Sequence, residues 1–323
     1  MRKKIIYIIL FLLTTVVATA QDFHLSQYEI ASQYLNPALT GMYSAKTSSY
    51  RIYSDYRTQW LSPSVKPYNS AFLAFDKPVR RRNKNFGFGA CLVNDNAGNG
   101  FLNTFNLMLS GAYDIMSSSH RKHLLSTGLQ LGMVYRKMDP GSFTYDAQYS
   151  GSIHDFDEAL PNEENFSRTS RAGLDANFGI FYKYTDSTRR AHPFIGISVF
   201  HLTQPNESFT DNKMKAPMRF NINGGCEFWI ENKLRVIPRF LYMNEARATE
   251  LNIGMLSYYR IADTQYEAVL QCDYRNQDAV IIGIGLKKYE HIFRISYDVN
   301  VSPLGSYLGG GGSFEFGIVF SGR

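Results

Sequence analysis

Apolar and polar side chains alternate in stretches of about ten residues along most of the chain. Near the C-terminus, Phe293, Ile295, Tyr297 and Val299 are separated by single polar residues. A period of two is typical of an extended strand whose two faces meet different surroundings. Gly, Asn, Asp or Pro follows most of these stretches, as in the turns between strands. The pattern therefore predicts an all-β chain.

About fourteen such strands can be placed on the sequence. They begin near residues 48, 70, 86, 104, 124, 172, 193, 218, 233, 249, 266, 280, 292 and 313. An even number suits a bacterial outer-membrane barrel, whose two ends then lie on the same side. The polar faces are rich in Gly, Asn and Ser, which suits a water-lined or polar-plugged lumen. A soluble β-sandwich would also alternate, but so many strands are too many for a single sandwich.

The connections between these strands alternate in length. Those after odd-numbered strands are long, as at residues 139–171, 203–216 and 302–312, whereas those after even-numbered strands are short, as at 263–264. Outer-membrane barrels have short periplasmic turns and longer external loops. We therefore predict an all-β fold, a transmembrane antiparallel β-barrel of about 14 strands over residues 46–323.

The first twenty residues predict a secretory signal peptide. Arg2, Lys3 and Lys4 precede an apolar stretch over residues 5–17, and Ala18-Thr19-Ala20 forms a small-x-small cleavage signal. Residues 21–45 lie between this signal (1–20) and the first strand, and we expect them to form a periplasmic N-terminal segment. Without the signal, 31 basic residues face 28 acidic ones, a net charge of +3. This modest charge argues against nucleic acid as a partner.

The composition favours a membrane location. The chain has 22 Tyr and 23 Phe, and charged residues make up only 19% of it, below the ~25% of an average soluble domain. Such an aromatic excess suits strands that face lipid and end in aromatic girdles. We therefore expect a multi-pass protein of the bacterial outer membrane, with membrane lipid as one partner. Three Cys without a C-x-x-C spacing argue against a zinc ribbon, and we expect neither a metal site nor a cofactor.

Several short motifs then point to a family. The chain reads FHLSQY from Phe23, LNPA from Leu35, Gly41, YRTQW from Tyr56, and ISYD from Ile295, followed by a last strand with Glu315. This chain resembles the PorP/SprF family of outer-membrane proteins, with its SQY, NPA and R-x-QW signatures. The resemblance covers nearly the whole mature chain, and its N-terminal part is the most specific.

The resemblance implies a component of the type IX secretion system and the gliding machinery. Members of the family associate with the periplasmic lipoprotein ring of the secretion motor, or help to export or hold a secreted surface adhesin. The expected function is to bind one or both of these partners. A substrate-specific or general porin is the alternative, and a barrel lipase is a third. No Gly-x-Ser-x-Gly, His-Glu-x-x-His or Walker A motif occurs, so we expect no catalytic residues and no enzyme activity.

Two groups of residues near the start of the barrel are candidates for partner binding. Asn36, Pro37 and Gly41 precede the first strand, and they form either a plug or docking ledge, or a structural tuck that closes the barrel floor. Arg57, Gln59 and Trp60 end the first strand near its outer rim. Trp60 there belongs to an aromatic belt, or the three residues grip an exported protein.

Charged residues supply the remaining candidates. Arg80, Arg81 and Arg82 form a basic turn on the predicted periplasmic side, which either meets an acidic partner or is simply solvated. Lumen-facing positions are predicted for Arg235, Arg239, Asp298 and Glu315. The predicted external loop over residues 139–166 contains seven acidic residues and no Lys or Arg. This loop is a solvated lid or a surface that binds a cation or partner, although no spacing matches a calcium loop.

Overall fold

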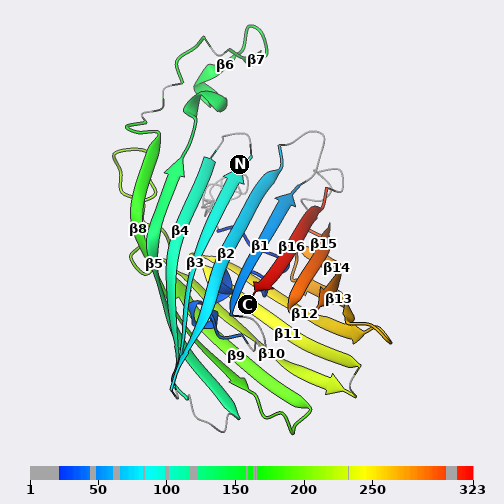
Figure 1. Ribbon diagram of the computed structural model, residues 1–323. Helices are drawn as coiled ribbons and strands as arrows, with labels where there is room; N and C mark the ends of the chain where they lie inside the picture. The colour runs from blue at the N-terminus through cyan, green and yellow to red at the C-terminus, as the bar shows by residue number, and fades with distance from the viewer. Residues whose placement is uncertain are drawn as a thin grey trace, which may run out of the picture.

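The computed structural model describes residues 22–43, 49–60, 66–82, 84–98, 102–116, 122–157, 159–162, 164, 166–231, 233–302 and 311–322. The predicted signal peptide lies outside these residues. Within the described part of the chain, fourteen antiparallel strands close into one barrel, and β1 pairs with β16 to complete it (Figure 1). The predicted fold class is therefore confirmed.

The strands of the barrel, in chain order, are β1 (Tyr50–Gln59), β2 (Tyr68–Arg81), β3 (Lys84–Ala97), β4 (Leu102–Asp114), β5 (His123–Lys137), β8 (Ser170–Tyr184), β9 (Ala191–Phe200), β10 (Arg219–Ile230), β11 (Leu234–Glu245), β12 (Ala248–Arg260), β13 (Tyr266–Arg275), β14 (Ala279–Lys288), β15 (His291–Asn300) and β16 (Ser313–Gly322). The short elements are α2 (Ser32–Leu35), η1 (Pro37–Leu39), η2 (Pro140–Ser142), η3 (Asp146–Gln148), β6 (Tyr149–Ser150) and β7 (Asp155–Phe156). No helix in the described ranges is long and apolar enough to cross a membrane.

Each strand of the wall has an apolar face that points away from the lumen. Leu109 in β4 and Ile284 in β14 are 64% and 62% exposed, whereas Asp55 in β1 and Gln130 in β5 point inward and are buried. An outward apolar face is stable only against hydrocarbon, since in water so much exposed apolar surface would drive association. The alternation that predicted the strands thus separates a lipid face from a lumen face.

The two ends of the barrel differ. The connections after β1, β5, β9 and β15 gather at one end, which we call the long-loop end, and the turn after β2 lies at the opposite, short-turn end. The connection between β5 and β8 carries the small β6–β7 hairpin, which extends far beyond the strands (Figure 1). The predicted alternation of connection lengths holds for the longest loops, but the connection after β11 is a tight turn.

The N-terminal segment lies inside the barrel. We call residues 22–43 the plug. The plug starts at the long-loop end, where Asp22 contacts Arg219 of β10. It then runs toward the short-turn end as far as Gly41, whose backbone N–H donates a hydrogen bond to Asp76 of β2. Ser26, Gln27, Gln33 and Asn36 are almost completely buried. The structure thus places the described part of residues 21–45, the segment expected in the periplasm, inside the barrel. The polar lumen face offers hydrogen-bonding partners to the segment, and these hold it within the barrel.

The lipid face gives a first prediction. Replacing Ile284 by Arg places a charge near the middle of the apolar band and should lower the free energy of unfolding by about 2–4 kcal/mol. Urea unfolding of the protein in lipid vesicles measures this, with Ile284→Leu as the matched control that keeps the apolar surface. An Arg variant as stable as the control would show that this face does not meet hydrocarbon.

Candidate functional site

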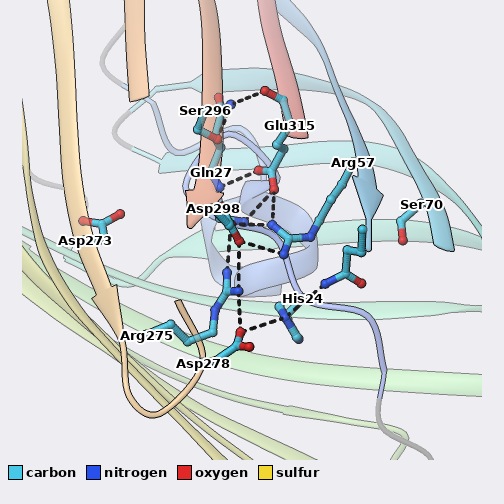
Figure 2. A network of polar contacts seen from close by, with 12 residues as sticks. His24, Gln27, Arg57, Ser70, Asp273, Arg275, Asp278, Ser296, Asp298 and Glu315 are labelled. Atoms are coloured by element: carbon cyan, nitrogen blue, oxygen red, sulfur yellow. Dashed lines mark hydrogen bonds and ion pairs between the residues drawn. The ribbon is translucent and has the colours of Figure 1, made fainter. Parts of the chain in front are cut away.

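The plug is held most tightly by a cluster that we call the clasp: Ser26, Gln27, Arg57, Arg275, Asp298 and Glu315 (Figure 2). The backbone N–H of Ser26 donates to Glu315 at 2.7 Å, and its hydroxyl donates to Asp298 at 2.8 Å. Arg57 donates to Glu315 at 2.9 Å and to Asp298 at 2.8 Å. Arg275 joins the cluster with a hydrogen bond of 2.8 Å to the Ser26 hydroxyl. Two buried cations and two buried carboxylates are thus matched around one serine of the plug.

The register of the sheet brings the clasp together. Arg57 of β1 lies directly opposite Glu315 of β16, across the pair of strands that closes the barrel. Glu315 in turn lies opposite Ser296 of β15, whose hydroxyl accepts a hydrogen bond of 3.1 Å from Gln27. The plug therefore contacts β15 and β16, next to the β1–β16 pair that closes the barrel.

The two carboxylates of the plug meet arginines of the wall. Glu29 pairs with Arg239 of β11 and with Arg294 of β15. Arg239 also bonds to Asp273 of β13 at 2.7 Å and lies over the ring of Tyr28, 4.6 Å from its centre. Buried arginine needs such partners, because an unpaired buried charge is strongly destabilising.

The second plug carboxylate forms the contact at the long-loop end. Asp22 bonds to Arg219 at 2.9 Å and to His201 at 2.8 Å, and His201 bonds through its other nitrogen to Asp175 at 2.7 Å. Burial alone would lower the pKa of His201, but the adjacent carboxylates of Asp22 and Asp175 raise that pKa to about 10. Burial would raise the pKa of Asp22, yet His201 and Arg219 hold it well below its usual range. At neutral pH the contact is therefore an ion pair.

The lower half of the plug docks through both side-chain and backbone groups. Asn36 accepts from the N–H of Ala38 at 2.9 Å, and its amide donates at 3.0 Å to the carbonyl of Ile180 in β8. Gly41 has a φ of +64°, and a Cβ added there would fall 2.6 Å from the Cα of Gly87 in β3. Glycine is required at this position both for its conformation and for the close approach.

Several cavities lie beside the plug in the part of the chain that the structure describes, among them an outer and an inner pocket. The outer pocket, of about 230 Å³, opens near the long-loop end and is lined by Arg57, Gln59, Trp60, His24, Glu250 and Asp278 among others. Burial, together with the charges of Arg275 and Arg57, holds the pKa of His24 well below its usual value, so the ring is neutral at pH 7. The inner pocket, of about 250 Å³, lies between the plug and strands β8 to β12 and has an apolar lining with Phe181, Phe194, Phe240 and Tyr258.

The candidates named from the start of the sequence lie in two places. Asn36, Pro37 and Gly41 are buried in the plug, where they serve its docking to the wall. Arg57 belongs to the clasp. With the side-chain oxygen of Gln59 facing the guanidinium of Arg57, this oxygen accepts a hydrogen bond of 2.9 Å from it. Trp60 is half-buried at the edge of the outer pocket, 4.5 Å from the ring of Tyr68. Trp60 also has a φ of +58°, a conformation that is rare for a bulky residue and marks local strain.

The remaining candidates are spread along the barrel. Arg235 pairs with Glu227 at 3.2 Å inside the lumen near the short-turn end, and Arg239, Asp298 and Glu315 belong to the plug contacts described above. Arg80, Arg81 and Arg82 are exposed at the short-turn end, far from the clasp. The structure therefore unites Arg239, Asp298 and Glu315 with the plug, and leaves Arg235 and the basic turn apart from it.

Sequence reasoning missed several residues that hold the plug: Asp22, Ser26, Gln27, Glu29, His201, Arg219, Arg275 and Arg294. A signal was present, because Arg294 and Asp298 share the polar face of one strand and Asp273 and Arg275 share that of another. Which carboxylate each arginine meets depends on the register around the barrel, which one sequence does not provide. Among the described residues, no group of three His, Cys, Asp or Glu is placed to hold a metal ion.

The clasp predicts a large effect of Arg57→Leu. This change leaves Glu315 and Asp298 buried with one cation fewer, and should destabilise the protein by about 3–5 kcal/mol. Thermal unfolding should show the loss, and hydrogen exchange at residues 26–28 should accelerate first. Arg81→Leu, at an exposed position, is the matched control and should change neither. Unchanged exchange at residues 26–28 would contradict the role of Arg57 in holding the plug.

The contact of Asp22 with His201 predicts a dependence on pH. Because the pKa of His201 is about 10 in the folded protein and about 6.5 when unfolded, its stabilising effect is full below pH 6.5 and is lost as the pH approaches 10. The hydrogen-exchange protection of the amides at residues 22–24, corrected for intrinsic exchange, should therefore fall between pH 6 and pH 9.5. The shift in the pKa of His201 sets the size of this fall at about tenfold or more. In His201→Asn the protection should be low and flat over this range, and a wild-type profile in that variant would exclude the mechanism.

Comparisons with known proteins agree with this architecture. A FadL homologue from Pseudomonas aeruginosa is 11% identical, with a TM-score of 0.52 over 91% of this chain and 94% of that chain. The toluene transporter TodX of Pseudomonas putida is 8% identical, with a TM-score of 0.52 over 93% of this chain and 94% of that chain. At such low identity the similarity shows the outer-membrane barrel fold alone. A search of curated proteins finds no match.

The family comparison covers nearly the whole chain. Residues 17–320 match the family described as "Type IX secretion system membrane protein PorP/SprF". The matched region includes the plug, the clasp and every strand of the barrel up to its closing pair. The chain therefore belongs to the PorP/SprF family of type IX secretion system membrane proteins, and it is a β-barrel of the bacterial outer membrane.

Proposed function

We propose that this protein is a closed, non-catalytic scaffold of the secretion machinery, which binds an exported surface adhesin on the outer side and the periplasmic lipoprotein ring of the motor on the inner side. The observation that carries this proposal is the plug, which runs through the lumen from the long-loop end to the short-turn end. A barrel filled in this way is suited to fixing partners at its two ends and is poorly suited to passing solutes.

The proposal assigns the long-loop end to the cell exterior, in accordance with the usual asymmetry of outer-membrane barrels. Two features of the short-turn end then support a periplasmic contact. Arg80, Arg81 and Arg82 are exposed there, so their charges are available to an acidic partner. The inner pocket beside the plug has an apolar lining that could receive a side chain from the same partner.

A porin is the competing function, and electrical measurement separates the two. In a planar bilayer the intact protein should show no steady conductance, because the plug contacts leave only cavities beside it. Arg219→Leu combined with Arg294→Leu removes one arginine partner from each of the two plug carboxylates. Only His201 beside Asp22 and Arg239 beside Glu29 then remain, and this weakening of the plug should produce conductance steps. Steady conductance of the intact protein would instead support the porin.

Partner binding is tested by purification from membranes of the native bacterium. The wild-type protein should co-purify with components of the secretion motor and with an exported adhesin. Arg80→Ser, Arg81→Ser and Arg82→Ser together should reduce recovery of the motor components without altering the barrel. Arg247→Ser, which removes an exposed arginine at the long-loop end, is the control and should leave that recovery unchanged. Recovery of neither class of partner with the wild-type protein would reject the scaffold function.

A further inference from the structure

The connection between β5 and β8 carries an apolar surface that lipid does not cover. We call residues 139–166 the arm; Figure 1 shows that its β6–β7 hairpin extends well beyond the long-loop ends of the strands. Tyr149, Ile153 and Phe156 at this hairpin are 50%, 58% and 42% exposed. On the barrel wall such exposure is explained by the surrounding membrane, but the arm stands outside the apolar band. Exposed apolar side chains clustered in this way mark an interaction site.

The described residues of the arm bond to one another, so the exposed side chains of its hairpin are not the remains of an unformed core. The hydroxyl of Tyr145 donates to the carbonyl of Pro140 at 2.8 Å, and the amide of Gln148 donates to the carbonyl of Leu160 at 3.0 Å. The N–H of Asp157 donates to the carbonyl of Gln148 at 2.8 Å. These bonds close the arm on itself while its hairpin side chains point outward. A preformed surface of this kind binds a partner at a lower entropic cost than a disordered loop.

The charge of the arm defines the chemistry of the partner. Residues 139–166 contain seven Asp and Glu and no Lys or Arg. Among the described acids, Asp155 flanks the exposed Phe156 directly, and Asp157 follows it. A partner must therefore present an apolar recess surrounded by basic side chains, because complementary potential both attracts it and excludes acidic competitors. The anionic phosphate groups of a lipid surface would be repelled by the same charge.

From these observations we propose that the arm is the outer docking surface of the protein, and that it binds a basic, apolar-lined segment of an exported protein. This inference rests on the proposed function, since it identifies the surface and the chemistry of the outer contact. Ile153 and Phe156 would enter the recess, and Asp155 and Asp157 would pair with its basic rim.

In-cell photo-crosslinking tests the proposal. A photoreactive phenylalanine analogue replaces Ile153 in the full-length protein, in cells that assemble the secretion machinery. After irradiation it should join an exported protein, at a segment in which Lys and Arg outnumber Asp and Glu. Adding Asp155→Asn and Asp157→Asn, which keep the hydrogen-bonding acceptors, should lower the yield at least fivefold. Asp211→Asn, the same change on a neighbouring loop at an exposed position, should leave it unchanged.

The outcomes separate the arm from the scaffold function. Crosslinking to lipopolysaccharide, absence of any product, or a yield that survives removal of both charges would overturn the docking surface. If secretion components still co-purify with the double Asn variant, the failure concerns the arm alone. Unchanged heat-modifiable migration of each variant on a gel confirms that the barrel has folded.

Discussion

Arg57, Arg219, Arg275 and Arg294 are almost wholly buried inside the barrel, and the matching of their charges is the constraint on which the rest of the structure depends. Removing one partner of a buried ion pair costs about 3–5 kcal/mol. Among the ion pairs that the structure describes, Arg219 and Arg294 find their carboxylates on the plug, at Asp22 and Glu29. Without the plug these two cations would lose their carboxylate partners, so the wall and the segment inside it form one electrostatic unit.

The presence of the plug also explains part of the composition of the lumen face. A barrel wall that faces bulk water does not require glycine, whereas a wall that contacts another backbone closely requires it at the points of contact. A Cβ added at Gly128 would fall 2.4 Å from the carbonyl carbon of Pro37, and one added at Gly179 would fall 2.0 Å from the side-chain oxygen of Asn36. Gly128 and Gly179 therefore mark the path of the plug, and the NPA motif is the part of the plug that passes them.

Much of the fold could be predicted from the sequence, because alternation is a local property. The strands begin within a few residues of their expected positions, since each apolar–polar stretch specifies its own lipid face. The position of residues 21–45 could not be predicted, because Asn36, Pro37 and Gly41 suit a tuck, a ledge or a plug equally well. A set of buried arginines decides among these three arrangements. The arginines come from five strands around the lumen: β1, β10, β11, β13 and β15. Such a set is visible only once the barrel has closed.

The clasp links docking of the plug to closure of the barrel. Arg57 on the first strand and Glu315 on the last lie opposite each other, and the backbone N–H of Ser26 bonds to that same Glu315. The plug precedes β1 in the chain, and its last described residues lie toward the short-turn end, where β1 begins. A barrel that closed without it would leave Glu315 without the backbone donors of Ser26 and Gln27. The final pairing of strands is therefore most favourable when the plug is in place, and the family motif around Ser26 and Gln27 is part of the chemistry that closes the barrel.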